Sequence, residues 1–538
     1  MQPGDDERKF TTESDIPLKK SYSPEDIAGL EYERDLGEPG GAPYTRGPYP
    51  DMYRSKLWRI SQLTGSGKVE DTRDRVMFSH EAGGDWVVFE VDQITTIHMW
   101  DPDHPEVVAR KDDVGLTGSP ILGLPDYEVL LKPLPLDKIY FHMGGSPWMN
   151  SCVYAVAEKR GVPLTDLHGT GQGEMFLPYL STPFKDMPPP SCHLRNNCDV
   201  VEFNVQNVPH VVPISCAGHN ARANGITAYE ELAIVLAWNI DHIEYTLRRG
   251  RLKIDDFAHA LGGVNYSIGR DFFEEIAKLR AARRMWYKLM KERYKAQDPK
   301  SFKVRIHGFS ADRDYTRQQP LINIVRSAYR TLAAALGGCQ SLGIGPYDEA
   351  ITTPSEEALV MAIRTQQVIQ HESGVASVAD PLAGSYYVEW LTNELEERAW
   401  KYLQKIEDAG GLVRTMETGW LHSEATRGAL EQERRLEKGE KKLVGYNCFQ
   451  TDEEVFEVRP HRASRAWEEA MARLETMKRE RDNTRLTKAL DELRRVVANP
   501  QENQFPAMME AVRAHATVGE IGQVYRDIWG IWNAPVPV

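Results

Sequence analysis

Short apolar runs alternate with amphipathic stretches between about residue 85 and residue 375. Six of the runs are predicted to be β-strands: DWVVFEV (85–91), KIYFHM (138–143), DVVEFNV (199–205), HVVPIS (210–215), HIEYTL (242–247) and FKVRIHG (302–308). Each of these runs is followed after a few residues by amphipathic or helix-favouring sequence. Such a succession predicts an α/β fold with a parallel sheet.

The clearest predicted helix covers DFFEEIAKLRAARRMWYKLMKERY (271–294). Its apolar stripe consists of Phe272, Ile276, Leu279, Trp286 and Met290, and Lys and Arg collect toward its carboxyl end. A helix with one apolar stripe packs on the outside of a sheet or barrel.

The two ends of the chain differ from this middle part. Residues 1–45 are polar and rich in Gly and Pro, which predicts an extended arm on a partner or on the body of the protein. Residues 451–538 are heavily charged and helical in pattern, with apolar residues such as Leu486, Leu490 and Leu493 at helical spacing. We therefore expect an arm (1–45), a main α/β domain (46–450) and a helical region (451–538).

The α/β succession allows a closed eight-stranded barrel or an open doubly wound sheet. A doubly wound nucleotide-binding sheet would begin with G-x-G-x-x-G after its first strand, and no such fingerprint is present there. Polar residues stand beside apolar runs far apart in the sequence, namely Gln172, His219 and Gln340. This arrangement favours a TIM (β/α)8 barrel, whose functional residues come from the ends of several strands.

Composition narrows the class of protein. The chain has 538 residues, 41% of them hydrophobic, and a net charge of −14, which argues against nonspecific binding to nucleic acid. Its six cysteines include no C-x-x-C pair, so neither a disulfide framework nor a metal site is expected. The start of the chain lacks signal-peptide features and no long apolar run occurs, so we expect a cytoplasmic protein that is not a membrane protein.

Six segments, in unbroken order, resemble one family. They are RGPYPDMYRSKLWRISQLTG (46–65), GTGQGE (169–174), PISCAGHNARANGITAYEELA (213–233), FFEEIAKLRAARRMW (272–286), GGCQSLGIGPYDEA (337–350) and QHESGVASVADPLAGSYYVEWLT (370–392). Together they resemble the large, substrate-binding subunit of adenosylcobalamin-dependent acyl-CoA mutases, the methylmalonyl-CoA mutase family. The resemblance implies a TIM barrel threaded by the pantetheine arm of coenzyme A, with the corrin against one mouth.

The sequence also contains a match to a short cobalamin-binding motif. Asp166, His168 and Gly171 fit Asp-x-His-x-x-Gly, but they lie in the middle of the expected barrel and no supporting segments follow. We interpret the match as coincidence and expect no cobalamin-binding domain on this chain. The resemblance then implies a separate small cobalamin-binding subunit as partner, in a hetero-oligomer, a heterotetramer, with dimerised large subunits.

The resemblance also implies roles for individual residues. His219 matches the histidine that hydrogen-bonds the thioester carbonyl, and Gln172 and Thr170 match contacts to the acyl and pantetheine portions. Gln340 and Glu372 match positions facing the corrin and the adenosyl ribose. From the residues alone, a core or capping role is the more common one for a histidine such as His219. Gln172 and Thr170 could cap helices or satisfy strand ends, and Gln340 and Glu372 could have surface or packing roles.

The CoA path is expected to be lined by Tyr49, Met52, Lys56 and Arg59. An arginine and a serine that contact CoA in the family are replaced here by Ala260 and Gly262. The residues that bind the nucleotide of CoA are therefore not fully identified by the resemblance.

Two substitutions bear on the substrate. Where methylmalonyl-CoA mutases hold the free carboxylate with tyrosine and arginine, this chain has Leu63 and Thr182. Burying a carboxylate without its cation is costly, so an uncharged branched acyl group is expected, of the isobutyryl, 2-hydroxyisobutyryl or pivalyl type. Glu90 or Asp92 could accept a hydrogen bond from a hydroxylated substrate.

Three functions therefore remain to be compared. The first is a radical 1,2-migration of the thioester carbonyl group in an acyl-CoA. The alternatives are a noncatalytic scaffolding subunit of a mutase complex and an acyl-CoA or acyl-carrier-protein binding module.

Overall fold

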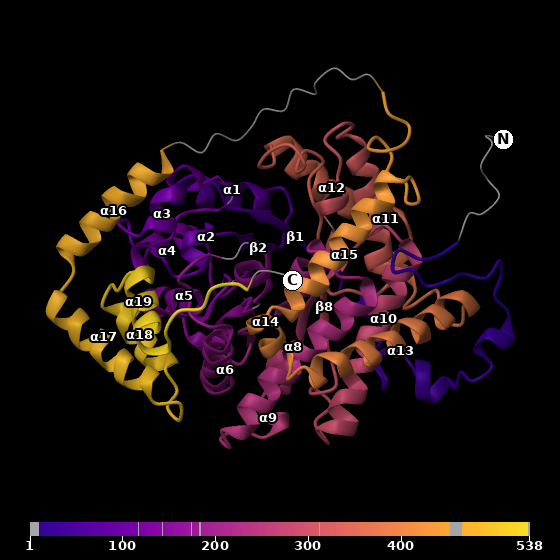
Figure 1. Cartoon of the computed structure of the whole chain (residues 1–538), viewed down its shortest axis with the longest axis horizontal. Helices are drawn as coiled ribbons and strands as arrows, with labels where there is room; N and C mark the ends of the chain where they lie inside the picture. The colour runs from indigo at the N-terminus through magenta and orange to yellow at the C-terminus, as the bar shows by residue number, and fades with distance from the viewer. Residues whose placement is uncertain are drawn as a thin grey trace.

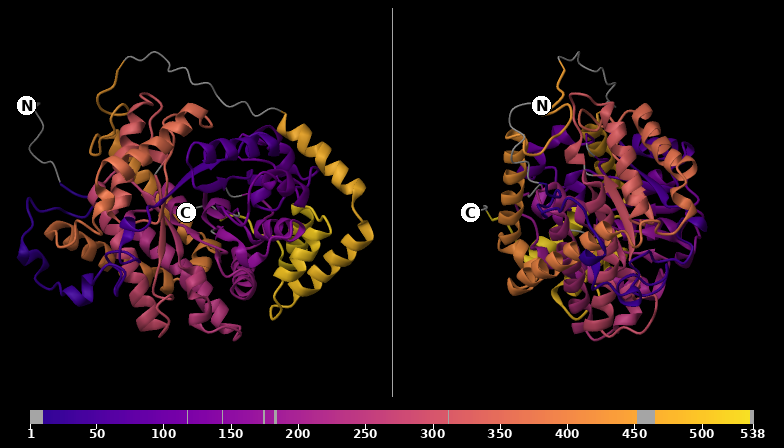
Figure 2. Two further views of the ribbon diagram at one scale, coloured as in Figure 1. Left: turned by 180° about the vertical axis from the view of Figure 1, so that it is seen from behind. Right: turned by 90° about the vertical axis from the view of Figure 1, so that its right-hand side faces the viewer.

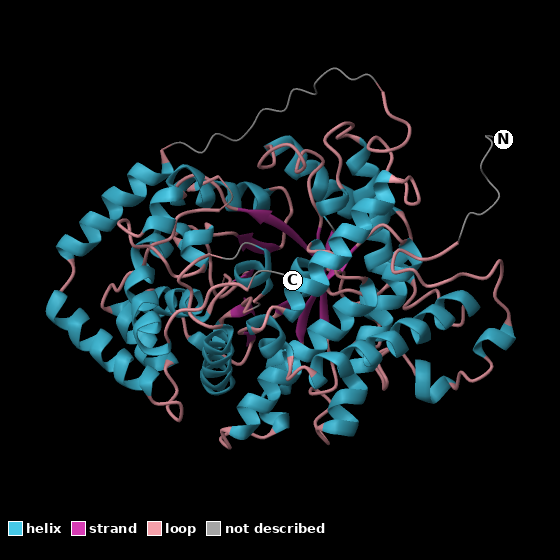
Figure 3. Ribbon diagram, viewed as in Figure 1, coloured by secondary structure: helices cyan, strands magenta, loops and turns pink. Residues whose placement is uncertain are grey.

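The computed structural model describes residues 10–116, 118–142, 144–173, 175–181, 184–310, 312–451 and 465–535. Strands lie at the centre and helices surround them (Figure 3). The strands are β1 (Arg59–Thr64), β2 (Trp86–Phe89), β3 (Tyr140–His142), β4 (His168–Thr170), β5 (Val211–Val212), β6 (Cys216–Ala217), β7 (Gly263–Ile268), β8 (Arg305–Ser310) and β9 (Ser341–Gly343). All strand pairs in this sheet are parallel, in the order β5-β4-β3-β2-β1-β9-β8-β7-β6.

The two ends of this order belong to one chain segment. β5 pairs with β4, β6 pairs with β7, and only residues 213–215 separate β5 from β6. The β4 side of the pairing continues past Val212, because the Gly173 N–H donates to the Ser215 carbonyl at 3.3 Å. Segment 211–217 thus bridges the edges of the sheet, and the nine short strands amount to an eight-stranded TIM-like barrel, as predicted.

The helices of the barrel and its surroundings have the following bounds: α1 (Val69–Glu81), α2 (Gln93–Thr96), α3 (Pro105–Ala109), α4 (Leu124–Leu131), α5 (Pro147–Lys159), α6 (Pro190–Asn207), α7 (Gly218–Ala223), α8 (Ala228–Arg248), α9 (Ile254–Leu261), α10 (Phe272–Lys288), α11 (Ile322–Leu336), α12 (Glu356–Glu372), α13 (Tyr386–Asp408), α14 (Leu412–Glu417) and α15 (Trp420–Glu437). The predicted helix at 271–294 is confirmed as α10, and Ile276, Leu279 and Trp286 of its stripe are buried.

Two strand predictions were wrong. DVVEFNV lies within α6 and HIEYTL lies within α8. In both cases an uninterrupted helix begins well upstream, and α8 starts at a capping box formed by Thr227 and Glu230. No glycine or proline stands between these starts and the apolar runs, so the helix continues through β-branched residues.

The chain beyond the barrel forms α16 (Ala466–Glu480), α17 (Asn483–Ala498), α18 (Phe505–Arg513) and α19 (Val518–Trp529). These helices lie beside the first half of the barrel, around α3, α4 and α5 (Figure 1). Phe505 of α18 packs on Phe203 of α6, with ring centroids 4.8 Å apart. In α19, added Cβ atoms at Gly519 and Gly522 would lie 2.1 and 1.9 Å from the carbonyl oxygens of Trp100 and His98, so only glycine permits this approach.

Residues 10–45 run along the opposite side of the molecule (Figure 2). Tyr22 packs against Trp390 of α13, with ring centroids 4.6 Å apart. Arg283 of α10 donates hydrogen bonds to the carbonyls of Tyr44 and Thr45, at 3.0 and 2.9 Å. The described part of the arm therefore lies on the chain's own body.

No helix within the described residues is both long enough and apolar enough to cross a bilayer.

Candidate functional site

The amino-terminal ends of the strands surround a cavity of about 440 Å³. Strand residues that lie at this end include Arg59, Tyr140, His168 and Arg305. Side chains alternate between the two faces of a strand, so the residues of β1 that share the inward face with Arg59 are Ser61 and Leu63. The interior of the barrel is thus reached from its amino-terminal mouth.

Cations are concentrated at this mouth. Lys56, Arg59, Lys300, Lys303 and Arg305 all line the cavity. Arg59 lies over the ring of Tyr140 at 4.4 Å and has the Asp85 carboxylate at 3.7 Å. Within the described part of the chain, the other four have no carboxylate within ion-pair distance, and Asp85 is the carboxylate that pairs at this mouth. Unpaired cations at a mouth are suited to the phosphates of a nucleotide.

Most of the predicted substrate-binding residues lie in this cavity. Tyr49, Met52, Lys56, Arg59 and Thr170 all line it. Met52 and Thr170 are buried, whereas Tyr49 is exposed. His168 also lies at this mouth, stacked on His210 with ring centroids 5.0 Å apart.

The structure does not bring Gln340 or Glu372 together with Gln172 and His219. Gln340 lines the amino-terminal cavity, and its side chain joins neighbouring segments: Oε1 accepts from the Ile306 N–H at 2.9 Å, and Nε2 donates to the Gly338 carbonyl at 2.8 Å. Glu372 is exposed at the last position of α12. The roles predicted for these two residues find no support in their positions.

Gln172 and His219 both follow the carboxyl ends of strands. The Gln172 N–H donates to the Gly144 carbonyl at 2.9 Å, which fixes the backbone just beyond β4. His219 is the second residue of α7, directly after β6. A Cβ at Gly218 would lie 2.6 Å from Val235 Cγ2, so glycine lets this turn pack closely on α8.

His219 is uncharged at neutral pH. Burial lowers the pKa of its imidazole to about 4, and repulsion from the nearby His142 contributes. Its Nδ1 is buried and has no hydrogen-bond partner among the described residues. The ring of Phe309 lies beside it, with centroids 4.8 Å apart. A neutral imidazole with a free nitrogen can donate a hydrogen bond to a carbonyl oxygen.

Two further histidines, His142 and His307, lie inside the barrel, and neither was predicted from the sequence to belong to the site. Burial lowers the pKa of His142 to about 4 and that of His307 to about 3. His307 Nδ1 pairs with Ser341 Oγ at 2.9 Å. Burial, together with the repulsion that a second positive ring nearby would cause, keeps the three imidazoles neutral, so the barrel interior is polar and uncharged at these positions. Their positions within apolar runs, alternating with buried residues, were the available signal.

The other predicted acyl-site residues are placed as follows. Leu63 is half-buried on the inward face of β1, in register with Val88 of β2. Thr182 lies outside the described residues. Glu90 lines a small cavity at the carboxyl ends of the strands, together with His142 and Gln172. Asp92 instead caps α2, its Oδ1 accepting from the Thr95 N–H at 2.7 Å, and burial raises its pKa to about 7.

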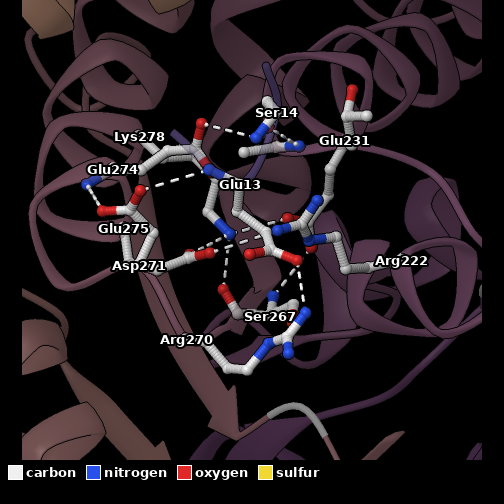
Figure 4. A network of polar contacts seen from close by, with 12 residues as sticks. Glu13, Ser14, Arg222, Glu231, Ser267, Arg270, Asp271, Glu274, Glu275 and Lys278 are labelled. Carbon is white, nitrogen blue, oxygen red and sulfur yellow. Dashed lines mark hydrogen bonds and ion pairs between the residues drawn. The ribbon is translucent and has the colours of Figure 1, made fainter. Parts of the chain in front are cut away.

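The amino-terminal arm approaches the side of the barrel that carries His219. A cavity of about 70 Å³ there is lined by Glu13 of the arm, His219, Arg270 and Phe309, among others. Glu13 pairs with Arg270 at 2.5 Å, and the Glu13 N–H donates to Asp271 Oδ2 at 3.2 Å (Figure 4). Burial raises the pKa of Glu13, but the cations of Arg270 and Lys441 outweigh burial and leave it below its ordinary value.

A buried charge network supports this docking. Lys278 of α10 is fully buried and pairs with Glu231 at 2.7 Å and with Glu275 (Figure 4). Glu274 accepts from the Ser14 N–H of the arm at 3.2 Å, and burial beside Asp271 raises its pKa to about 7. The arm is therefore held by Arg270 and Asp271, which directly precede α10, and by Glu274 in its first turn.

Comparison with known proteins places the chain among relatives. The sequence model of the methylmalonyl-CoA mutase family matches residues 11–531. The large subunit of 2-hydroxyisobutanoyl-CoA mutase from Aquincola tertiaricarbonis is 37% identical over 534 residues, covering 98% of this chain and 93% of the relative. The chain belongs to the methylmalonyl-CoA mutase family.

Methylmalonyl-CoA mutases themselves are similar at slightly lower identity. The enzyme from Cereibacter sphaeroides is 35% identical, with 99% of this chain and 74% of the relative covered. The human mitochondrial enzyme is 32% identical, with 96% of this chain and 68% of the relative covered. As a member of the methylmalonyl-CoA mutase family, the chain is an isomerase of the mutase class, and the predicted family and fold are confirmed.

The carboxyl-end residues of this family member also fit a corrin cofactor. Gln172 and Asn220 supply neutral polar groups at this end, and a Cβ at Gly145 would meet no atom within 4 Å, so a flat ligand could approach there. In the part of the chain that the structure describes, no cluster of three metal-ligating side chains occurs. These residues would contact the corrin periphery, and the cofactor would supply the radical chemistry.

Proposed function

We propose that this chain is the large, substrate-binding subunit of an adenosylcobalamin-dependent mutase that moves the thioester carbonyl group of a branched, uncharged acyl-CoA by a 1,2-shift. Its partner would be a small cobalamin-binding subunit, in a hetero-oligomer containing dimerised large subunits in the cytoplasm. Adenosylcobalamin, when bound, supplies the radical that such a rearrangement requires.

One observation carries the proposal. The amino-terminal cavity combines unpaired cations at its mouth with a neutral, polar interior, and His219 lies beyond that interior. The mouth suits the phosphates of CoA, and the interior suits its uncharged pantetheine arm and thioester. Lys56 and Arg59 would bind phosphate, and Tyr49, Met52 and Thr170 would line the arm.

At the acyl end, residues of this chain would hold the acyl group and polarise the thioester carbonyl. His219 would donate a hydrogen bond to the thioester carbonyl and stabilise negative charge that develops on its oxygen. Gln172 would orient the acyl group without adding charge, and Leu63 and Thr182 would leave the acyl pocket neutral. Phe309 beside His219 would help to exclude water.

The test is reconstitution. The purified chain would be combined with a small cobalamin-binding subunit of this family and adenosylcobalamin, then supplied with isobutyryl-, 2-hydroxyisobutyryl- and pivalyl-CoA. Isomeric thioesters detected by mass spectrometry would support the proposal.

Other outcomes identify the alternatives. A complex that binds both cobalamin and acyl-CoA but forms no isomer and no cob(II)alamin from any ester would indicate a noncatalytic scaffold. Binding of acyl groups by the chain without any association with a cobalamin subunit would indicate a binding module. His219 and Gln172 line small cavities past the carboxyl ends of the strands, across the barrel from the cavity suited to CoA, and this placement favours the catalytic alternative.

A further inference from the structure

His142 is a buried imidazole to which the proposed reaction assigns no task. Its side chain is about 6% exposed, and it lies at the last position of β3. The ring shares a hydrogen bond with the Gln172 side chain. Its Nδ1 is buried and has no hydrogen-bond partner among the described residues.

The position of His142 is that of an acyl-site residue. Its Cα pairs with that of Thr170 on β4, and Tyr140, two residues earlier, pairs with Trp86 on β2. The β2 residue two places beyond Trp86 is Val88, which pairs with Leu63. Leu63, Val88, His142 and Thr170 therefore form one level of the barrel wall. The small cavity beyond this level is lined by His142, Gln172 and Glu90.

An unpaired nitrogen at this position constrains the ligand. A buried polar atom without a partner is destabilising, and a ligand group that pairs with it recovers that free energy. A neutral imidazole offers one donor and one acceptor, and a hydroxyl can both donate and accept. A hydroxyl would therefore pair with Nδ1 in either tautomer of the ring.

We propose that His142 is a specificity-determining residue that hydrogen-bonds a hydroxyl group on the acyl chain of the thioester substrate. The inference rests on the proposed function and narrows its substrate class to hydroxyacyl-CoA. Gln172 holds the imidazole ring in place, and Leu63 and Val88 cover the alkyl part of the acyl group.

Charge disfavours a carboxylate in the same place. No lysine or arginine is among the described residues that line the small cavity, and Glu90 is one of them. A carboxylate there would be buried without a cation. An alkyl group in place of the hydroxyl would leave Nδ1 unpaired.

Two thioesters of nearly equal shape test the inference. Pivalyl-CoA and 2-hydroxyisobutyryl-CoA differ only by a methyl in place of a hydroxyl. Calorimetric titration of the purified chain with each ester gives the ratio of the two dissociation constants without requiring turnover. We expect the wild-type chain to bind the hydroxyacyl ester about tenfold more tightly, as one recovered hydrogen bond implies.

Two variants separate recognition from folding. His142→Phe removes both ring nitrogens and is expected to abolish or invert the preference. His142→Asn keeps a short polar group and is expected to retain part of it. Circular dichroism and the affinity for free CoA, which binds at the distant mouth, report whether each variant is folded.

The possible results are distinct. A wild-type chain that binds both esters with equal affinity would overturn the inference and leave the proposed function standing. Equal losses for both esters in His142→Phe, with CoA affinity retained, would also overturn it, because His142 would then only position Gln172. Failure of the wild-type chain to bind either ester, or CoA, would overturn the proposed function itself.

Discussion

The ring of Phe309 lies against the ring of His219, with centroids 4.8 Å apart and planes tilted by 31°. The two residues come from β8 and from the turn after β6, and together they line one cavity. Phe309 restricts how the imidazole can turn, so the free Nδ1 of His219 has a defined direction. This pairing makes His219 the residue whose loss should affect turnover most.

Replacing His219 with alanine should lower kcat by about 10²- to 10⁴-fold, the range expected for a group that donates a proton or hydrogen bond in the transition state. Acyl-CoA affinity should change much less, because the proposed nucleotide site lies at the amino-terminal mouth, away from His219. The measurement is steady-state kinetics of the reconstituted complex. His371→Ala, at an exposed position of α12, is the matched control, and unchanged turnover in His219→Ala would remove the proposed role.

The cations at the amino-terminal mouth should control affinity and leave the chemical step intact. Lys303→Ala or Arg305→Gln should raise KM about tenfold, because a charge-assisted hydrogen bond to phosphate is lost, while kcat changes little. The effect should be smaller for esters of dephospho-CoA if the lost contact is with the 3′-phosphate. Lys488→Ala, an exposed lysine on α17, serves as control, and an equal rise in its KM would contradict the assignment.

Buried Lys278 should be far more important for stability than an exposed lysine in an ion pair. Lys278→Met leaves Glu231 and Glu275 buried without their cation, which should cost about 3–5 kcal/mol in the free energy of unfolding. Lys401→Met, which breaks the exposed pair with Glu397, should cost at most about 1 kcal/mol. Urea unfolding compares the two variants, and equal effects would contradict the importance of the buried network.

Gly522→Ala should destabilise the protein, although alanine usually stabilises a helix relative to glycine by roughly 1 kcal/mol. The new Cβ would lie 1.9 Å from the His98 carbonyl oxygen, so α19 must move away from the segment that it covers. Gly29→Ala is the control, because a Cβ there meets nothing within 4 Å. A melting temperature of Gly522→Ala at or above that of the wild type would show that α19 can shift without cost.

His142 should make the protein sensitive to acid. Its pKa is about 4 in the folded state and about 6.5 when unfolded, so the unfolded chain binds the extra proton between these values. The stabilisation is present above pH 6.5 and is lost as the pH falls toward 4, by about 3 kcal/mol in total. His142→Phe should therefore lose less stability than the wild type between pH 7 and pH 4.5 in urea unfolding. Parallel pH dependences of the two proteins would contradict the lowered pKa.

The sequence predicted the barrel because its strands are short apolar runs separated by helices. β2, β3 and β5 lie within predicted runs, and β8 overlaps the run at 302–308. The strands at 263–268 and 341–343 were missed, since GVNYSI and SLG carry few of the apolar residues that mark a buried strand. Buried polar side chains such as Asn265 and Ser341 face the interior, where a tunnel replaces a dry core.

The sequence located candidate residues where side chains lie next to a recognisable segment: Lys56 and Arg59 line the amino-terminal cavity, and Gln172 and His219 follow the carboxyl ends of strands, while their roles stay predictions. Lys300, Lys303 and His142 could not be found in this way, because their roles depend on which strand ends meet around one mouth. Gln340 was selected as a cofactor contact, but its side chain joins neighbouring segments. A polar side chain beside a strand can bond to the backbone as readily as to a ligand, and the sequence does not distinguish the two.

The cavity of the barrel opens among the amino-terminal strand ends, whereas Gln172 and His219 lie past the carboxyl ends. If the thioester enters at the mouth and reacts beside His219, as we propose, entry and chemistry would be served by opposite ends of the barrel. A thioester could be loaded and its product released from one side while a protein remains seated on the other, so turnover would not require the assembly to come apart.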